Sequence, residues 1–140
     1  MARALRASPH VEEAIYSGLE GISGTRWRDG CSRHTRKSLL DLLEDPRRQG
    51  FPFRGMISFR IKGGFEAAER FLTSTRLFTL AESLGGVESL AEYPAKMTHG
   101  SVPERERELL GIGEGLVRLS VGVEEAEDLV RDVLQALEKV

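Results

Sequence analysis

The stretch LLGIGEGLVRLSVGVEEAEDLVRDVLQAL (109–137) changes its hydrophobic period halfway along and thereby decides the fold class. In LVRLSVG (116–122) successive side chains alternate in character, which predicts a strand. From about Glu124 to Lys139 apolar residues recur at helical spacing, and the acidic first turn suits the helix dipole. The apolar stripe of this helix consists of Leu129, Val130, Val133 and Leu137. A strand followed by an amphipathic helix indicates a sheet covered by helices.

The same two periods recur earlier in the chain. GMISFRIK (55–62) alternates and predicts a half-buried strand, and FEAAERFLTS (65–74) has an apolar helical face. The other expected elements are helices at 2–8, 38–45 and 103–110, and extended segments at 11–16, 77–81 and 88–94. We therefore expect an α/β (α+β) fold, in which helices pack on one face of a mixed sheet.

Composition narrows the class of protein further. The 140 residues are 30% charged and 40% hydrophobic, which is typical of one globular domain. The net charge of −2 argues against a chain that coats nucleic acid. No apolar run approaches the ~20 residues of a membrane helix, and residues 1–13 lack the apolar core of a secretory signal. A single cysteine, Cys31, favours a reducing, cytoplasmic location.

Charge is distributed unevenly along the chain. Residues 1–54 hold 10 basic and 7 acidic side chains, whereas residues 55–140 hold 10 and 15. The basic excess lies between Arg26 and Arg54, a segment with glycine and proline that we interpret as a long loop. One alternative function is a nucleic-acid-binding module that uses Arg26, Arg28, Arg33, Arg36, Lys37, Arg47 and Arg48. Few aromatic residues accompany these charges, which favours a solvated loop instead.

The histidines and the cysteine do not predict a metal site. Cys31 and His34 have the spacing of half a site, but His10 and His99 complete no ligand pattern that we recognise. We therefore expect no metal.

Two features carry chemistry. Arg118 stands among the apolar residues of its strand. A buried guanidinium needs an anionic partner, because an unpaired buried charge is costly. The planar guanidinium matches the geometry of a carboxylate, which is therefore the expected partner. The alternative is an arginine on the solvent face of an edge strand. In AESLGGVESL (81–90), Gly85 and Gly86 permit a tight turn, and Ser83 with the amides after it could bind an anion. The alternative there is a plain turn between strands.

FTLAESLGGVESLAEYPAKMTH (78–99), followed by residues 109–137, resembles the C-terminal region of the Cys/Met-metabolism family of pyridoxal-phosphate enzymes. Residues 2–19 and 55–64 also resemble parts of that region. The resemblance implies the small C-terminal domain of the fold type I PLP-dependent transferases. It divides the chain into the start of that domain (1–19), an unmatched basic insert (20–54) and the remaining substrate-recognition part (55–140).

The resemblance also implies a substrate site. Arg118, in RLSVG, matches the arginine that holds the substrate α-carboxylate, and Ser83 matches the serine that supports this carboxylate. Glu82 would receive the distal ammonium of an amino-acid substrate such as cystathionine, and Thr98 would line the same pocket. The most similar members cleave the Cγ–S bond of cystathionine and release cysteine, 2-oxobutanoate and ammonia.

The cofactor machinery of the family is not recognisable here. Its Schiff-base lysine lies in an S-x-T-K motif, and none of the lysines has that context: Lys37, Lys62, Lys96 and Lys139. We therefore expect pyridoxal 5′-phosphate in the complete family enzyme but not covalently on this chain, and no catalytic residue on this chain. Because the family forms homotetramers, a non-catalytic isoform that associates with full-length subunits is a second alternative. Neither nucleic acid nor membrane is expected as a partner.

Limited proteolysis tests the interpretation of residues 20–54. The segment has few apolar residues to offset the entropy lost on ordering, so trypsin should cut there first, after Arg or Lys. Mass spectrometry of the earliest fragments checks this. Initial cleavage within 55–140 would contradict the prediction.

Overall fold

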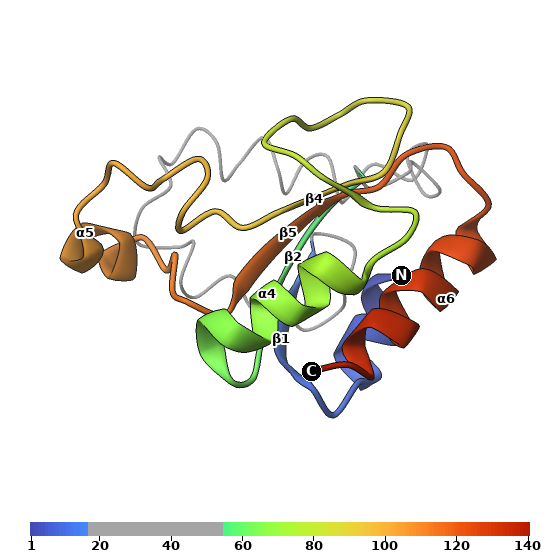
Figure 1. Ribbon diagram of the computed structural model, residues 1–140, viewed down its shortest axis with the longest axis horizontal. Helices are drawn as coiled ribbons and strands as arrows, with labels where there is room; N and C mark the ends of the chain where they lie inside the picture. The colour runs from blue at the N-terminus through green and yellow to red at the C-terminus, as the bar shows by residue number, and fades with distance from the viewer. Residues whose placement is uncertain (17–54) are drawn as a thin grey trace, which may run out of the picture.

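The computed structural model describes residues 1–16 and 55–140 (Figure 1). Its elements are α1 (Ala2–Ala7), β1 (Val11–Ile15), β2 (Met56–Ile61), α4 (Gly64–Ser74), β3 (Thr79–Leu80), β4 (Leu90–Glu92), α5 (Glu104–Leu109), β5 (Leu116–Ser120) and α6 (Ala126–Leu137). Every element expected within this part of the chain is present, so the mixed α/β class is confirmed. The expected helix at 38–45, the basic segment 20–54 and the Cys31–His34 pair lie outside the described residues.

The strands form one mixed sheet in the order β1-β2-β5-β4-β3. All neighbours are antiparallel except β3 and β4, which run parallel. Strand β5 is therefore central, and Arg118 stands between Ser58 of β2 and Glu92 of β4. The alternative of an edge-strand arginine is wrong. The segment with Gly85 and Gly86 connects the parallel strands β3 and β4, so it is a longer loop and not a hairpin turn.

One face of the sheet carries the hydrophobic core. Phe59 of β2 meets Phe71 of α4 edge to face, with ring centroids 5.3 Å apart. Figure 1 shows α4 and α6 on the same side of the sheet, and Leu5 of α1 is buried in the same core. This arrangement confirms the expectation of helices on one face. Helix α5 is the exception, because none of its residues is buried and it lies apart from the other helices.

The buried Asp132 links α6 to the segment that enters β3. Its carboxylate accepts hydrogen bonds from the backbone N–H groups of Arg76 (2.9 Å), Leu77 (2.8 Å) and Phe78 (3.3 Å). The side-chain amide of Gln135 donates a further bond of 3.1 Å to this carboxylate. Asp132 thus fixes the chain just before the loop between β3 and β4.

Within the described residues, every helix is too short or too polar to cross a membrane.

Replacing Asp132 with Ala should lower the free energy of unfolding by about 2–4 kcal/mol, because several backbone donors lose their acceptor. Urea denaturation followed by circular dichroism measures the change. Asp128→Ala on the same helix is the matched control, because Asp128 is exposed and its carboxylate forms a surface ion pair with Arg131. Its effect should stay within about 0.5 kcal/mol. Equal losses for the two variants would contradict the role of Asp132.

Candidate functional site

Arg118 and Glu92 form an ion pair between the central strand and its neighbour. Glu92 is 1% exposed, so its carboxylate requires a partner, and its Oε2 contacts Nη2 of Arg118. The Arg118 side chain is 21% exposed and therefore still reaches the surface. The pair lies opposite the core, because Arg118 and Glu92 alternate with Leu119 and Ala91, which belong to the core. The strand arginine thus has the anionic partner that its surroundings demand.

Thr98 contacts the same carboxylate from the loop after β4. Its hydroxyl donates a hydrogen bond to Oε1 of Glu92 and lies 2.8 Å from Nδ1 of His99. Since the only hydroxyl hydrogen is directed at Glu92, we assign a hydrogen to Nδ1 of His99, which then donates to Thr98. Four side chains are thereby connected, from His99 through Thr98 and Glu92 to Arg118.

The loop between β3 and β4 brings the predicted Glu82 beside Arg118. Nη2 of Arg118 lies 3.4 Å from the backbone carbonyl oxygen of Glu82. The side chains of Glu82 and Ser83 are exposed. Gly85 has φ +74°, a conformation that favours glycine, and its N–H donates to Oγ of Ser120 at 2.8 Å. The SLGG loop is therefore attached directly to the RLSVG strand.

Ser89, Gly122 and Glu124 form a second attachment of this loop. The Ser89 hydroxyl donates to Glu124 (2.8 Å) and accepts from the N–H of Gly122 (2.9 Å), while the Ser89 N–H donates to Glu124 (2.7 Å). A Cβ on Gly122 would lie 2.3 Å from the carbonyl oxygen of Val87, so only glycine fits. Hydrogen bonds from its own N–H and from Ser89 lower the pKa of Glu124, although desolvation opposes them.

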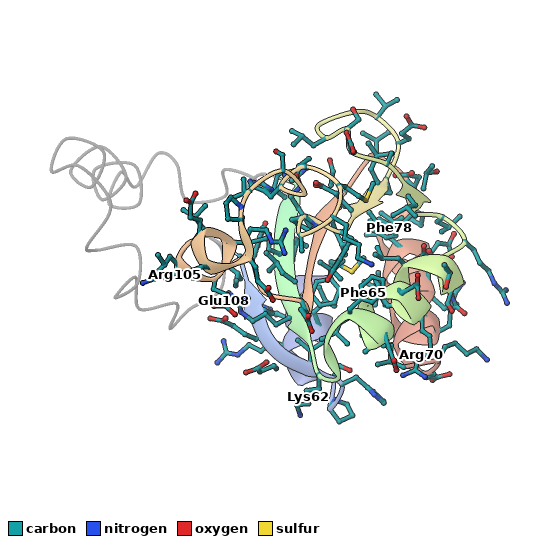
Figure 2. All side chains as sticks on the ribbon, turned by 60° about the vertical axis from the view of Figure 1, so that its left-hand side comes forward. Lys62, Phe65, Arg70, Phe78, Arg105 and Glu108 are labelled. Atoms are coloured by element: carbon teal, nitrogen blue, oxygen red, sulfur yellow. The ribbon has the colours of Figure 1, made fainter. Side chains whose placement is uncertain are left out.

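A separate pocket of about 630 Å³ lies beside α5 and contains none of the predicted site residues. Phe65 of α4 and Glu108 of α5, both labelled in Figure 2, are among its lining residues. Lys96 lies over the Phe65 ring, 3.3 Å from its centroid, and the Tyr93 hydroxyl donates to the Glu114 carbonyl oxygen at 2.8 Å. Burial and the Glu114 charge raise the pKa of Tyr93, and Arg107 partly offsets them. The amine of Lys96 and the hydroxyl of Tyr93 are therefore both engaged, by the Phe65 ring and by a backbone carbonyl oxygen.

The structure connects three of the four predicted residues around Glu92. Arg118 contacts Glu92 directly, Thr98 does so through its hydroxyl, and Glu82 contributes its backbone carbonyl, with Ser83 next to it in the loop. The sequence did not predict a role for Glu92. The sequence shows only that an acidic residue lies in the predicted strand ESLAEYP (88–94). That this residue faces Arg118 follows from the pairing of β4 with β5.

The described residues do not fit the attachment of a pyridoxal-phosphate cofactor. Nζ of Lys62 donates to the Pro9 carbonyl oxygen at 2.6 Å, and Lys96 stacks on Phe65. Lys139, the third lysine of the described residues, is exposed just after the end of α6. None of these three amines has a contact with Arg118, Glu92 or Thr98 within the described residues. Within residues 1–16 and 55–140, no three His, Cys, Asp or Glu side chains are grouped to hold a metal ion.

Comparison with known proteins identifies relatives along nearly the whole chain. The model of the Cys/Met metabolism PLP-dependent enzyme family matches residues 43–138 and so extends into the segment 20–54. Cystathionine gamma-lyase from Saccharomyces cerevisiae is 64% identical over 85 residues, which cover 61% of this chain and 22% of that enzyme. Cystathionine gamma-lyase from Bos taurus is 47% identical over 137 residues, which cover 98% and 29%.

A solved structure shows the same arrangement. The crystal structure of metB from Corynebacterium glutamicum superposes with a TM-score of 0.74 at 42% identity, covering 98% of this chain and 30% of that one. The chain thus spans less than a third of the length of these relatives.

The hydrogen bonds between Ser89 and Glu124 should make the free energy of unfolding depend on pH in the acidic range. Because the pKa of Glu124 is lowered in the folded state, its stabilising effect is complete above pH 4.5 and is lost as pH falls through the folded pKa. Glu124→Gln should therefore destabilise the protein at pH 7, and its difference from the unmodified chain should shrink below pH 4.5. Urea denaturation at pH 7, 5, 4 and 3 measures this. Glu125→Gln at the exposed neighbouring position is the control. A difference that is independent of pH would refute the assignment.

Proposed function

The chain belongs to the Cys/Met metabolism PLP-dependent enzyme family, and on that basis we propose that it is the substrate-recognition part of a cystathionine γ-lyase-like protein. One observation carries the proposal: Arg118 is tethered to Glu92 at Nη2 in the central strand, and its Nε and Nη1 have no partner among the described residues. A guanidinium held in this way presents donors to a carboxylate from outside. The names of the relatives supply the class of substrate.

In this proposal Arg118 binds the α-carboxylate of an amino acid. Two parallel N–H donors fix both the position and the plane of a carboxylate, which orients the neighbouring Cα. Ser83 adds a hydroxyl donor to this carboxylate, and Glu82 receives the distal ammonium of cystathionine. The exposed side chains of both residues and the contact of the Glu82 carbonyl with Arg118 support these roles. Thr98 lines the pocket and also bonds to Glu92.

The reaction proposed for the complete protein cleaves the Cγ–S bond of cystathionine and, with water, yields cysteine, 2-oxobutanoate and ammonia. In such enzymes pyridoxal phosphate serves as the electron sink. The described residues offer no fitting attachment for it, and the chain has no S-x-T-K sequence. The present chain therefore contributes substrate binding, whereas the chemical steps depend on further polypeptide.

The proposal also includes contact between this chain and other polypeptide. That polypeptide would belong either to the same subunit or to another subunit of the family's homotetramer. Large apolar side chains are exposed on the site loop and beside it, namely Leu84 (52%), Val87 (75%) and Val123 (82%). Val87 and Val123 are neighbours, because the Val123 N–H donates to the Val87 carbonyl oxygen at 2.9 Å. This surface supports contact with another protein chain. The single cysteine of the chain supports the cytoplasm as its location.

Arg118→Ala should weaken binding of L-cystathionine to the chain by about 10- to 150-fold, the range that corresponds to the loss of a charged hydrogen bond. Titration of the ¹⁵N-labelled 140-residue chain, followed by amide chemical shifts, measures the affinity. Arg131→Ala, at an exposed arginine of α6, is the control and should leave the affinity unchanged. Equal affinities for the Arg118 variant and the unmodified chain would exclude the proposed site.

The same preparation tests whether further polypeptide is needed. With pyridoxal phosphate and L-cystathionine added, the chain alone should release no 2-oxobutanoate above the rate of free cofactor. A lactate-dehydrogenase-coupled assay detects this product. Release that disappears in Arg118→Ala would show that the chain carries out the chemistry by itself.

A further inference from the structure

We propose that Glu92 is the positioning residue of the substrate arginine and that its buried carboxylate selects which edge of the Arg118 guanidinium faces the substrate, an inference that rests on the proposed function. Glu92 matches none of the residues to which the family resemblance gives a role. Its assignment comes from burial, from the strand register and from the division of its two oxygens between two partners.

Burial distinguishes Glu92 from an ordinary strand carboxylate. Its side chain is 2% exposed, and removing such a charge from water is costly unless it is paired and hydrogen-bonded. Oε1 accepts a hydrogen bond from Thr98, whereas Oε2 accepts no hydrogen bond within the described residues and is balanced by the charge of the Arg118 nitrogen that it contacts. The hydrogen bond and the charge contact together leave the carboxylate little freedom to rotate, and the nitrogen that it contacts is restricted with it.

The strand register places the two charges directly opposite each other. Glu92 of β4 and Arg118 of β5 are Cα partners in an antiparallel pair, so their side chains leave the same face of the sheet. The contacts of Arg118 with Glu92 and with the Glu82 carbonyl oxygen both use Nη2. This anchoring leaves Nε and Nη1 as the donors for a ligand. Without Glu92, the long arginine side chain would sample several rotamers, and binding would have to order it.

A second cross-strand pair in the same sheet provides an internal comparison. Arg60 of β2 and Glu13 of β1 are also register partners, with Nε and Oε2 3.1 Å apart. Glu13 is 54% exposed, however, and such a pair contributes little to rigidity or stability in water. The two pairs have the same chemistry and differ in burial. Glu13 is therefore a matched control for Glu92.

The test uses the complete 140-residue chain with ¹⁵N-labelled arginine. Arg118→Ala assigns the Arg118 side-chain signals by their disappearance. In the unmodified chain we expect separate Nη proton signals for Arg118, because the Glu92 contact slows rotation of the guanidinium. Glu92→Gln keeps the shape of the side chain but removes its charge. It should merge these signals and weaken L-cystathionine binding about tenfold or more, the loss expected for one charged hydrogen bond. Glu13→Gln should change neither measurement.

A second variant keeps the test decisive if Glu92→Gln fails to fold. Thr98→Val alters an exposed residue and removes the hydrogen bond to Oε1 of Glu92. The charges of Glu92 and Arg118 stay paired in this variant. It should broaden the Arg118 signals and weaken binding by a smaller factor than Glu92→Gln, because the contact of Oε2 with Arg118 and the charge of Glu92 both remain.

The outcomes separate this inference from the proposed function. If Arg118→Ala weakens binding but Glu92→Gln and Thr98→Val leave both measurements unchanged, the positioning role is wrong and the carboxylate site stands. If Glu92→Gln tightens binding, Glu92 competes with the substrate for the guanidinium, and the inference is overturned. If Arg118→Ala itself has no effect, the proposed function fails first.

Discussion

The ion pair between Arg118 and Glu92 is the constraint on which the site depends. A guanidinium in the central strand is tolerated only because the neighbouring strand supplies a carboxylate at the matching register position. Such buried pairs usually add little net stability, because desolvation offsets the attraction. We therefore infer a geometric contribution: the pair fixes Nη2 of Arg118, and in the proposed function the other guanidinium nitrogens bind the substrate.

The loop that carries Glu82 and Ser83 is held mainly through its backbone, with the Ser89 hydroxyl as an added side-chain contact at its end. Asp132 binds the N–H groups before it, Ser120 binds the N–H of Gly85, and Glu124 binds the N–H of Ser89. The side chains in the middle of the loop take no part in these contacts and are exposed. A loop of this kind combines a defined path with side chains that are available to a substrate or to another chain.

The helices support this arrangement from the other side of the sheet. α4 and α6 bury the face that contains Phe59, Val117 and Leu119, so the strands beneath the site cannot shift without disrupting the core. The polar pair and the apolar core thus occupy alternate positions of the same strands. The chain spans less than a third of the length of the relatives that it matches.

The sequence alone determined the elements of the fold and supplied the candidate residues of the site. The strands at 55–62 and 116–122 and the helices at 65–74 and 124–139 were predictable because hydrophobic period is a local property that neighbouring residues set. The motifs around Glu82, Ser83, Thr98 and Arg118 likewise predicted a carboxylate site, whose individual roles stay predictions. Only the tertiary structure decided that Glu92 is the partner of Arg118 and that Thr98 acts on Glu92. These residues meet through the pairing of β4 with β5, and a shift of that pairing by one residue would turn Glu92 to the other face. Register depends on the packing of the whole sheet, and no local pattern encodes it.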